Sequence, residues 1–541
     1  MELKLNKLNK FEGRKGPLLL VIMDGVGIGK EDEGNAIYKA NTPKLDELMK
    51  MPLYTELKAH GPAVGLPSED DMGNSEVGHN ALGAGRVFAQ GAKLVNLSLE
   101  TKKLFEGETW KTAVKKGQDG GTVHFIGLLS DGNVHSHINH LYKFISKCAE
   151  ENVNKVRVHV LLDGRDVGEK SALDYVKPLE EFLAKINSEK GVDYKIASGG
   201  GRMITTMDRY NADWSIVERG WKAHVLGEAR EFGSASEAVQ TYYDEDPKMT
   251  DQYMDSFVVA ENGKPVGTIE DGDSVVLFNF RGDRAIEISK AFEDKDFTEF
   301  DRKRFPNIFY AGIMEYDGDL HIPNNYLVTP PDIDRTVCEY LCNEGVKSFA
   351  ISETQKFGHV TYFWNGNRSG YINEDLELYV EIPSDKIPFD QAPKMKAVEI
   401  TDKAIELLES GNFQFGRINY ANGDMVGHTG MMDAAIESVE VVDNSLARLQ
   451  KVVDKLGGIM IVTADHGNAD EMFSVKNGVK SPKTSHTLNP VPFIIYDSKY
   501  NNEYEMAKVE NPGLTNIAAT LLNLLGFEKV EDYDASLIKL K

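Results

Sequence analysis

The sequence predicts an α/β fold in which mixed or parallel sheets are sandwiched by helices. Short, continuous apolar runs such as residues 17–23 have the pattern of strands that are buried on both faces. Segments with apolar residues every three or four positions, the period of an amphipathic helix, separate some of these runs. Polar and charged motifs follow many of the runs directly, and open α/β sheets bind ligands at the carboxyl ends of their strands.

The apolar runs give the expected elements in chain order. We expect strands at residues 17–23, 123–128, 156–162, 194–197, 274–280, 345–351, 415–420, 459–462 and 492–496. Residues 173–186 and 436–456 have helical periodicity, and Gly457-Gly458 ends the second helix. At 541 residues, the chain is long enough for two large domains or about three or four average ones.

Composition excludes several classes of partner. The net charge of −24 argues against nucleic acid and anionic membranes. No apolar run reaches the roughly 18 residues that a membrane span needs, and residues 1–16 lack the apolar core of a signal peptide. The three cysteines form no paired metal motif, which is typical of a reducing compartment. We therefore expect a cytoplasmic protein without a nucleic-acid or membrane partner.

One serine stands in a setting that suits a nucleophile. The stretch M-G-N-S-E-V-G-H places Ser75 on a tight turn that opens a predicted helix. The free N–H groups of such a helix end favour an anion beside it, so a phosphoryl group could be carried there. Taken alone, the stretch fits a helix-capping serine better. The rest of the chain has to decide between the two.

Carboxylate and imidazole groups follow several of the predicted strands. Aspartate and histidine are ligands suited to Mn²⁺, Zn²⁺ or Mg²⁺. Each aspartate alone could equally cap a turn, and each histidine could be packed in the core. Together the strand-end groups favour a metal centre, and they are Asp24, Asp424 with His428, Asp465 with His466, and the later His486.

A second set of motifs is rich in arginine. These arginines follow predicted strands, several of them beside glycines, against a strongly acidic background. Planar guanidinium groups bind phosphate and carboxylate with paired hydrogen bonds. A lone arginine is more often part of a surface salt bridge, but the set favours an anion pocket, and its members are Arg165, Arg202, Arg209, Arg281 and Arg284.

Seven motifs in one order resemble the cofactor-independent phosphoglycerate mutases of the alkaline phosphatase-like superfamily. The match extends over nearly the whole chain after about Gly16. The motifs are D-G-V-G at Asp24, M-G-N-S-E-V-G-H around Ser75, D-G-N-V-H-S-H at Asp131, D-G-R-D at Asp163, E-T-Q-K-F-G-H at Glu353, G-D-M-V-G-H at Gly423 and T-A-D-H-G-N at Thr463. The resemblance implies an isomerase that interconverts 3-phosphoglycerate and 2-phosphoglycerate without 2,3-bisphosphoglycerate.

The resemblance also implies a role for each candidate residue. Ser75 would be the phosphorylated nucleophile. One metal ion would be held by Asp424, His428 and His486, and the other by Asp24, Ser75, Asp465 and His466. The substrate would be bound by His135, Arg165, Asp166, Arg202, Arg209, Arg281, Arg284 and Lys356.

The expected chemistry follows from these groups. Metal coordination can lower the pKa of an oxygen nucleophile, and Lys356 could neutralise charge on the transferring phosphoryl group. Asp166 is the candidate acid and base for the two substrate hydroxyls. We expect two divalent ions, with manganese as first choice and magnesium, cobalt or zinc as alternatives, in a monomeric enzyme acting on a small molecule.

The motif order predicts one domain inserted into another. Asp24 and Ser75 would have to meet Asp424, Asp465 and His486, although a long region intervenes. We expect a metal-binding domain formed by residues 1–88 and 331–541, with a substrate-binding domain at 89–330. The linkers would lie near residues 85–91 and 317–331, the second of which is rich in Pro, Gly and Asn.

Two other functions remain open at this point. A related metal-dependent phosphohydrolase or a phosphopentomutase would keep the metal ligands without needing this set of arginines. A non-catalytic metal-binding protein would need neither Ser75 nor Lys356. Incubation with 3-phosphoglycerate separates the three, because the product would be 2-phosphoglycerate, free phosphate or nothing.

Overall fold

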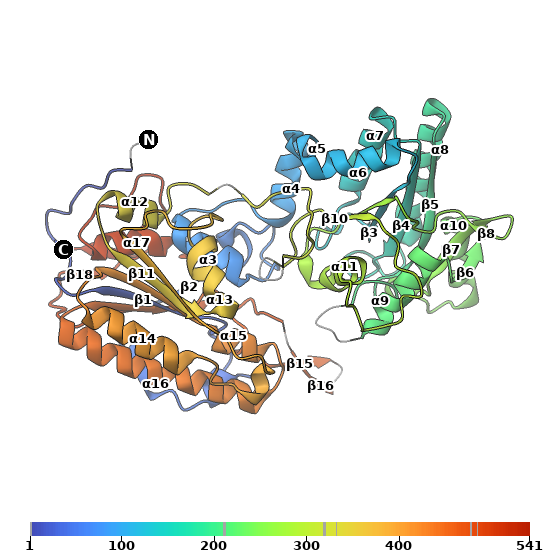
Figure 1. Cartoon of the computed structure of the whole chain (residues 1–541). Coiled ribbons are helices and arrows are strands. Elements are labelled where there is room, and N and C mark those ends of the chain that lie inside the picture. Colours follow the sequence, from blue (N-terminus) through green and yellow to red (C-terminus); the bar gives the residue numbers. More distant parts are fainter. Residues whose placement is uncertain (1–2, 209–212, 318–320, 332, 477–478, 484) are drawn as a thin grey trace. The chain divides into compact units, whose positions relative to one another are not determined.

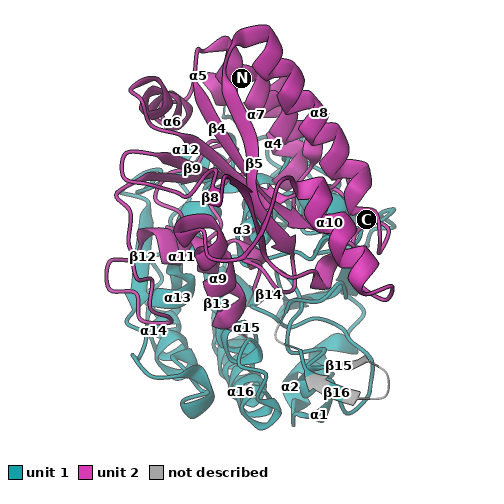
Figure 2. Ribbon diagram, turned by 90° about the vertical axis from the view of Figure 1, so that its right-hand side faces the viewer, with its two compact units in different colours: residues 1–90, 331–541 teal, residues 91–330 magenta. Residues whose placement is uncertain are grey.

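The structure is a computed structural model that describes residues 3–208, 213–317, 321–331, 333–476, 479–483 and 485–541. The chain forms two compact units, coloured separately in Figure 2. Unit 1 consists of residues 1–90 and 331–541, and unit 2 of residues 91–330. The sequence placed these divisions after residues 88 and 330.

Unit 1 is built on one mixed sheet in the strand order β12-β11-β13-β1-β14-β17-β2. All the residues of its central strand β1 are buried, as the apolar run predicts. The strands are β1 (Leu18–Met23), β2 (Tyr54–Leu57), β11 (Ser348–Glu353), β12 (Glu377–Ile382), β13 (Phe415–Tyr420), β14 (Ile459–Thr463) and β17 (Val491–Asp497). Two small two-stranded sheets lie outside it: β15 (Phe473–Lys476) with β16 (Val479–Pro482), and β18 (Tyr504–Met506) with β19 (Ile538–Leu540).

The register of unit 1 gathers several strand ends at one edge. Strand β1 pairs in parallel with both β13 and β14, so that Met23 lies opposite Tyr420, and Ile22 opposite Thr463. Strand β17 is antiparallel to β14 and begins at the same edge, with Phe493 opposite Thr463. The segments after β1, β13 and β14 and the segment before β17 therefore meet at this edge.

Helices cover both faces of the unit 1 sheet (Figure 1). The long helices α14 (Ala397–Glu409) and α16 (Met432–Leu456) lie along one face, and α3 (Ser75–Ala84), α12 (Val337–Asn343) and α17 (Asn516–Leu524) lie on the other. Short helices complete the unit: α1 (Ala36–Lys39), α2 (Pro43–Met49), α13 (Thr354–Gly358) and α15 (Asn422–Gly427).

Unit 2 contains a second mixed sheet, in the order β10-β9-β3-β4-β5-β7-β6 with β8 paired to β7. The pairs from β10 to β5 are parallel, whereas β7 is antiparallel to β5. The strands are β3 (Val123–Leu128), β4 (Lys155–Leu162), β5 (Asp193–Gly201), β6 (Arg230–Phe232), β7 (Phe257–Glu261), β8 (Lys264–Pro265), β9 (Ser274–Leu277) and β10 (Phe309–Gly312).

Both faces of the unit 2 sheet are also buried. In β3, Val123 and Phe125 belong to one hydrophobic cluster, whereas Ile126 and Leu128 belong to another. The first cluster includes residues of α4 (Gly91–Glu100), α5 (Lys103–Glu106), α6 (Glu108–Gln118), α7 (Ile138–Glu150), α8 (Ala172–Lys190) and α10 (Ala235–Glu245). The second includes residues of α9 (Trp214–Trp221), α11 (Ile286–Glu293) and the π-helical turn Lys222–Leu226.

The predicted α/β class is confirmed, and most predicted strands match within two residues. Three boundaries were wrong by more than two residues. Strand β11 begins at Ser348, whereas the sequence began it at residue 345. Strand β5 continues through Gly201, whereas the sequence ended it at residue 197. Strand β9 stops at Leu277 rather than at residue 280, because the Leu128 N–H donates to the Asn279 side chain (2.9 Å) instead of continuing the ladder. Among the described residues, no helix is long and apolar enough to span a membrane.

Candidate active site

Ser75 is the first residue of α3 and is 3% exposed. Asn74 caps the helix, its side chain accepting from the Val77 N–H at 3.0 Å, so Ser75 does not serve as the cap. The Ser75 hydroxyl oxygen lies 2.6 Å from Lys356 Nζ and 3.0 Å from His466 Nε2. The serine oxygen thus has an ammonium group and an imidazole beside it, at a helix N-terminus that favours negative charge.

A first carboxylate–imidazole group forms around Asp424, which lies in α15 just after β13. Its Oδ1 is 3.1 Å from His428 Nε2 and 3.2 Å from His486 Nε2. The two histidine Nε2 atoms are 3.0 Å apart. These three side chains present ligand atoms close enough together to hold one ion.

A second group consists of Asp24, Asp424 and His466. His466 Nε2 lies 3.2 Å from Asp24 Oδ1 and 3.9 Å from Asp424 Oδ1, and the Ser75 hydroxyl donates to Asp24 Oδ1 at 3.3 Å. Asp465, predicted as a ligand with this group, instead places Oδ2 3.3 Å from His79 Nδ1 and 3.9 Å from His466 Nε2. Asp424 therefore takes part in both groups.

Two glycines allow the segments that carry Asp24 and Asp424 to touch through their main chains. Gly25 has φ +75°, and a Cβ there would lie 2.5 Å from the Asp424 nitrogen. A Cβ on Gly423 would lie 2.7 Å from the Asp24 carbonyl oxygen. A side chain at either position would push the two strand-end segments apart.

Electrostatics in this cluster are dominated by buried carboxylates. Burial alone would raise the pKa of Asp424, but Lys356 and the nearby histidines hold it well below its usual range. Burial would lower the pKa of His466, yet Asp465, Asp424 and Asp24 raise it to about 10. For His486, burial together with the charge of His466 lowers the pKa to about 4.

Three observations fit a divalent cation at these groups. His486 Nδ1 is 2.7 Å from the Gly73 carbonyl oxygen, so this nitrogen carries the proton and Nε2 turns a lone pair toward Asp424. Among the described residues, both buried carboxylate oxygens of Asp465 lack a hydrogen bond of standard geometry. The carboxylates that raise the pKa of His466 attract a cation as they attract a proton.

Unit 2 brings together another group of predicted residues at the carboxyl ends of β3, β4 and β5. Arg202 Nη1 donates to Asp163 Oδ1 at 2.8 Å and to Asp166 Oδ2 at 2.5 Å. Asp163 also accepts from the Ser130 hydroxyl at 2.6 Å and from the Asp166 N–H at 3.0 Å. Asp163 holds the loop after β4, while Arg202 orients the carboxylate of Asp166.

The remaining unit 2 residues predicted to bind substrate have differing exposure. His135 and Arg284 are buried, Arg281 is half-buried, and Arg165 is exposed just after β4. Arg209 lies outside the described residues.

Three polar residues near Ser75 were not among the predicted site residues. Asn419 donates to Asp24 Oδ2 at 2.9 Å, and Asn468 donates to Asp424 Oδ1 at 3.0 Å. His79 Nδ1 lies 2.8 Å from the Ser75 carbonyl oxygen. His79 and Asn468 belong to the motifs quoted above. Asn419 and Arg417 are the two polar residues inside the predicted strand 415–420, and that is the signal that could have identified Asn419.

Comparison with known proteins identifies the family. A sequence model described as the metalloenzyme superfamily matches residues 16–529. A Leptospira interrogans protein named as a probable 2,3-bisphosphoglycerate-independent phosphoglycerate mutase is 53% identical, over 99% of this chain and 100% of its own. The mutase of that name from Trypanosoma brucei brucei is 53% identical, over 96% of this chain and 97% of its own.

A solved structure agrees with the sequence relatives. It is the Leishmania mexicana phosphoglycerate mutase at low cobalt concentration, which is 51% identical and has a TM-score of 0.69. The match covers 99% of this chain and 100% of the other. The chain therefore belongs to the metalloenzyme superfamily and, within it, to the 2,3-bisphosphoglycerate-independent phosphoglycerate mutases.

Proposed function

We propose that this chain interconverts 3-phosphoglycerate and 2-phosphoglycerate, an isomerase step of glycolysis, through a phosphoserine at Ser75 and without 2,3-bisphosphoglycerate. The observation that carries the proposal is the Ser75 hydroxyl, placed 2.6 Å from Lys356 Nζ beside two metal-binding groups. Family membership supports the reaction, and the geometry supports the residue that carries the phosphoryl group.

Ser75 and Lys356 are the proposed catalytic pair in unit 1. The Ser75–phosphorus bond would form as the bond from phosphorus to the 3-oxygen of the glycerate breaks, and the reverse transfer to the 2-hydroxyl would complete the exchange. Lys356 contacts the serine oxygen and, at 2.8 Å, Asp424 Oδ2, so its ammonium group is held where charge develops.

Two divalent ions complete this proposal. Asp424, His428 and His486 would hold one, and Asp24, Ser75, Asp465 and His466 the other. Carboxylate oxygen combined with imidazole nitrogen suits manganese, with magnesium, cobalt and zinc as alternatives. When bound, the ions would supply Lewis-acid stabilisation of the serine oxygen and of phosphoryl charge.

In unit 2, substrate binding is assigned to His135, Asp166, Arg165, Arg202, Arg209, Arg281 and Arg284, with Lys356 contributing from unit 1. Guanidinium groups would grip the carboxylate and phosphate of the glycerate with paired hydrogen bonds. Asp166, oriented by Arg202, would return a proton to the leaving oxygen and take one from the hydroxyl that attacks next.

The proposal extends to the setting in which the enzyme works. All three cysteines are free, which supports a reducing compartment such as the cytoplasm. We also propose that the chain acts as a monomer. Light scattering of the active protein would test the oligomeric state.

The decisive assay supplies 3-phosphoglycerate and Mn²⁺ and leaves out 2,3-bisphosphoglycerate. Phosphorus NMR should show 2-phosphoglycerate growing to equilibrium, and acid-quenched protein should carry one added phosphate on the peptide that contains Ser75. Release of free phosphate as the main product would instead identify a phosphohydrolase.

A matched serine pair controls for folding. Ser75→Ala should abolish both the product and the added phosphate. Ser438→Ala removes another buried hydroxyl of unit 1, one that donates to the Ala435 carbonyl at 2.8 Å inside α16, and should leave both signals. Turnover by Ser75→Ala would remove Ser75 from the mechanism.

A further inference from the structure

A continuous chain of hydrogen-bonded side chains runs through the interior of unit 2. Its members come from β3, β4, β5, the turn Lys222–Leu226, the loop after β5 and the residue just before β9, and each is at most 5% exposed. In order, the contacts are Asp273 Oδ2 to His124 Nε2 (3.1 Å), His124 Nδ1 to His159 Nε2 (2.9 Å), His159 Nδ1 to Ser198 Oγ (2.7 Å), Ser198 Oγ to His224 Nδ1 (2.7 Å) and His224 Nε2 to Thr206 Oγ1 (2.8 Å).

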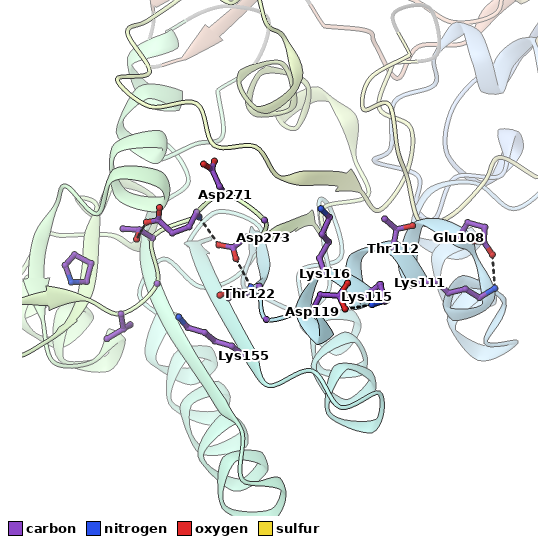
Figure 3. A pocket seen from close by; sticks show the side chains of 18 residues that line it. Glu108, Lys111, Thr112, Lys115, Lys116, Asp119, Thr122, Lys155, Asp271 and Asp273 are labelled. Carbon is purple, nitrogen blue, oxygen red and sulfur yellow. Dashed lines mark hydrogen bonds and ion pairs between the residues drawn. The ribbon is translucent and has the colours of Figure 1, made fainter.

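Asp273 fixes the direction of every bond in this chain. Its Oδ1 accepts from the Thr122 N–H at 2.6 Å, and its Oδ2 accepts from the Glu270 N–H at 2.8 Å. Because both oxygens already face N–H groups, the side chain is an ionised acceptor, and His124 Nε2 must be the donor to it. In Figure 3, Asp273 and Thr122 are joined in the wall of an open cavity of about 980 Å³.

The remaining donors and acceptors follow from that first bond. Burial lowers the pKa of His124, His159 and His224, so each imidazole is neutral with one N–H. His124 donates to Asp273, so its Nδ1 accepts from His159, whose Nδ1 in turn accepts from the Ser198 hydroxyl. Ser198 then accepts from His224 Nδ1–H, and His224 Nε2 is left as an acceptor for the Thr206 hydroxyl.

Thr206, the last member, has a strained backbone. Its φ is +73°, a conformation that β-branched residues rarely adopt and that persists only where the surroundings impose it. The Thr206 N–H also donates to the Ile216 carbonyl at 2.8 Å. The side chain and the main chain are thus fixed together at this strained position.

The strain lies next to the arginines assigned to the substrate. Arg284 Nη1 donates at 2.6 Å to the carbonyl of Met207, the residue after Thr206. Arg202 begins the same loop, which its N–H joins to Leu162 of β4 at 3.0 Å. The φ of Thr206 helps to set where the Met207 carbonyl points, and therefore where Arg284 is held.

We propose that Thr206, fixed by the chain that starts at Asp273, is a positioning residue that orients Arg284 for the substrate anion. The inference rests on the proposed function for the identity of that anion. The chain sets the tautomer of His224, so that His224 Nε2 accepts from the Thr206 hydroxyl. This last bond anchors Thr206 and thereby holds the Met207 carbonyl against the Arg284 guanidinium.

Two pairs of variants test the last link of the chain. Thr206→Val is nearly isosteric and removes the hydroxyl, whereas Thr206→Ser retains it. His224→Gln keeps an acceptor near the Nε2 position for Thr206, whereas His224→Asn keeps a donor near the Nδ1 position and leaves Thr206 unanchored. Tyr194→Phe is the control, because it removes another buried hydroxyl of β5, one that donates to the Val153 carbonyl at 2.8 Å.

We expect Thr206→Val and His224→Asn to raise KM for 3-phosphoglycerate about tenfold while kcat changes less, the signature of lost ground-state binding. Thr206→Ser and His224→Gln should stay near wild type. Tyr194→Phe should leave KM unchanged even if its melting temperature falls as far. Equal KM increases in Thr206→Val and Tyr194→Phe would overturn the inference, as would an unchanged KM in Thr206→Val and His224→Asn.

Amide hydrogen exchange without substrate separates this inference from the proposed function. Thr206→Val should speed exchange across residues 203–208, and Thr206→Ser and Tyr194→Phe should not. If wild-type protein converts no 3-phosphoglycerate, the proposed function fails, yet exchange and calorimetric binding of inorganic phosphate still report on the loop. Exchange in Thr206→Val that matches wild type would show that the hydroxyl does not hold the loop, and would end the inference.

Discussion

In unit 1, several negatively charged carboxylates lie close together around Ser75. In unit 2, by contrast, the carboxylate of Asp163 accepts hydrogen bonds from neighbouring donors. Asp24, Asp424 and Asp465 are all buried in one cluster, and their carboxylates carry more negative charge than Lys356 neutralises. In unit 2, Asp163 accepts from both a hydroxyl and a guanidinium group.

The difference separates two kinds of site. Buried carboxylates without enough positive charge beside them are destabilising unless a cation binds. We therefore expect the unit 1 cluster to be stabilised by a bound cation. In the unit 2 cluster, Asp163 and Asp166 already form ion pairs with Arg202, so a ligand there competes with internal ion pairs. Loss of a group should therefore stop the chemistry in unit 1 and weaken affinity in unit 2.

The largest contrast between the two units is expected for Ser75, the proposed nucleophile. Ser75→Ala should lower kcat on the order of 10⁴-fold or more, as loss of a covalent nucleophile does elsewhere. Calorimetric affinity for 3-phosphoglycerate should change by less than about threefold, because the arginines are untouched. A large loss of affinity would break the division between chemistry and binding.

Removal of metal should come next. Dialysis against a chelator should lower activity on the order of 10³-fold, and added Mn²⁺ should restore it. Hydrogen exchange should accelerate at residues 421–428 of unit 1, where Asp424 loses its counter-charge, and stay constant at residues 160–166 of unit 2. Equal acceleration in both segments would contradict the contrast.

A guanidinium substitution should act mainly on affinity. Arg202→Lys replaces a planar group that contacts both Asp163 and Asp166 with a single ammonium point charge. KM for 3-phosphoglycerate should rise about 10- to 100-fold, with a smaller change in kcat. Arg230→Lys, which alters an exposed pair with Glu245 in the same unit, is the control and should leave KM unchanged.

The smallest effect is a pH dependence of stability in unit 2. Burial lowers the pKa of His224 to about 3. Below pH ≈ 6.5, His224 therefore binds a proton in the unfolded chain but stays neutral in the folded chain. Stability is therefore lost as pH falls from 6.5 toward 3. Between pH 7 and pH 5 this histidine should cost about 2 kcal/mol.

Urea unfolding can isolate that contribution. In a Trp364→Phe background the remaining tryptophans, Trp110, Trp214 and Trp221, all belong to unit 2, so their fluorescence reports on it. His224→Gln should reduce the pH 7 to pH 5 loss by about 2 kcal/mol. An identical pH dependence in both proteins would mean that other groups control the acid sensitivity of unit 2.

The central strands of both sheets were predictable because they coincide with apolar runs. The strands that the sequence did not predict include β2, β6, β7, β8, β10 and β12. Strands β3 and β13 match the predicted residues, since a polar motif begins two residues after the end of each strand. The prediction ended strand β5 too early, because the sequence Gly199–Gly201 resembles a loop. The strand needs glycine there, since a Cβ at Gly199 would lie 2.6 Å from both the Val160 carbonyl oxygen and the Phe257 ring.

The residues of the candidate site were also predicted only in part. Asp24, Asp424 and His466 stand just after apolar runs, where the sequence marks them out. The chain from Asp273 to Thr206 was missed because His124, His159 and Ser198 lie inside strands and meet only through sheet register, in which His159 faces Ser198. Register depends on pairing between distant segments, and periodicity in one segment does not specify it.

The contact between the Gly25 and Gly423 segments limits how the proposed metal centre can be engineered. Because the two segments touch through main-chain atoms, the spacing of their carboxylates is a property of the backbone rather than of neighbouring side chains. Libraries that vary the surrounding side chains would retune charge and polarity while leaving that spacing in place. Alanine or serine at one of these two glycines would move the strand ends apart, which would favour an ion of larger radius.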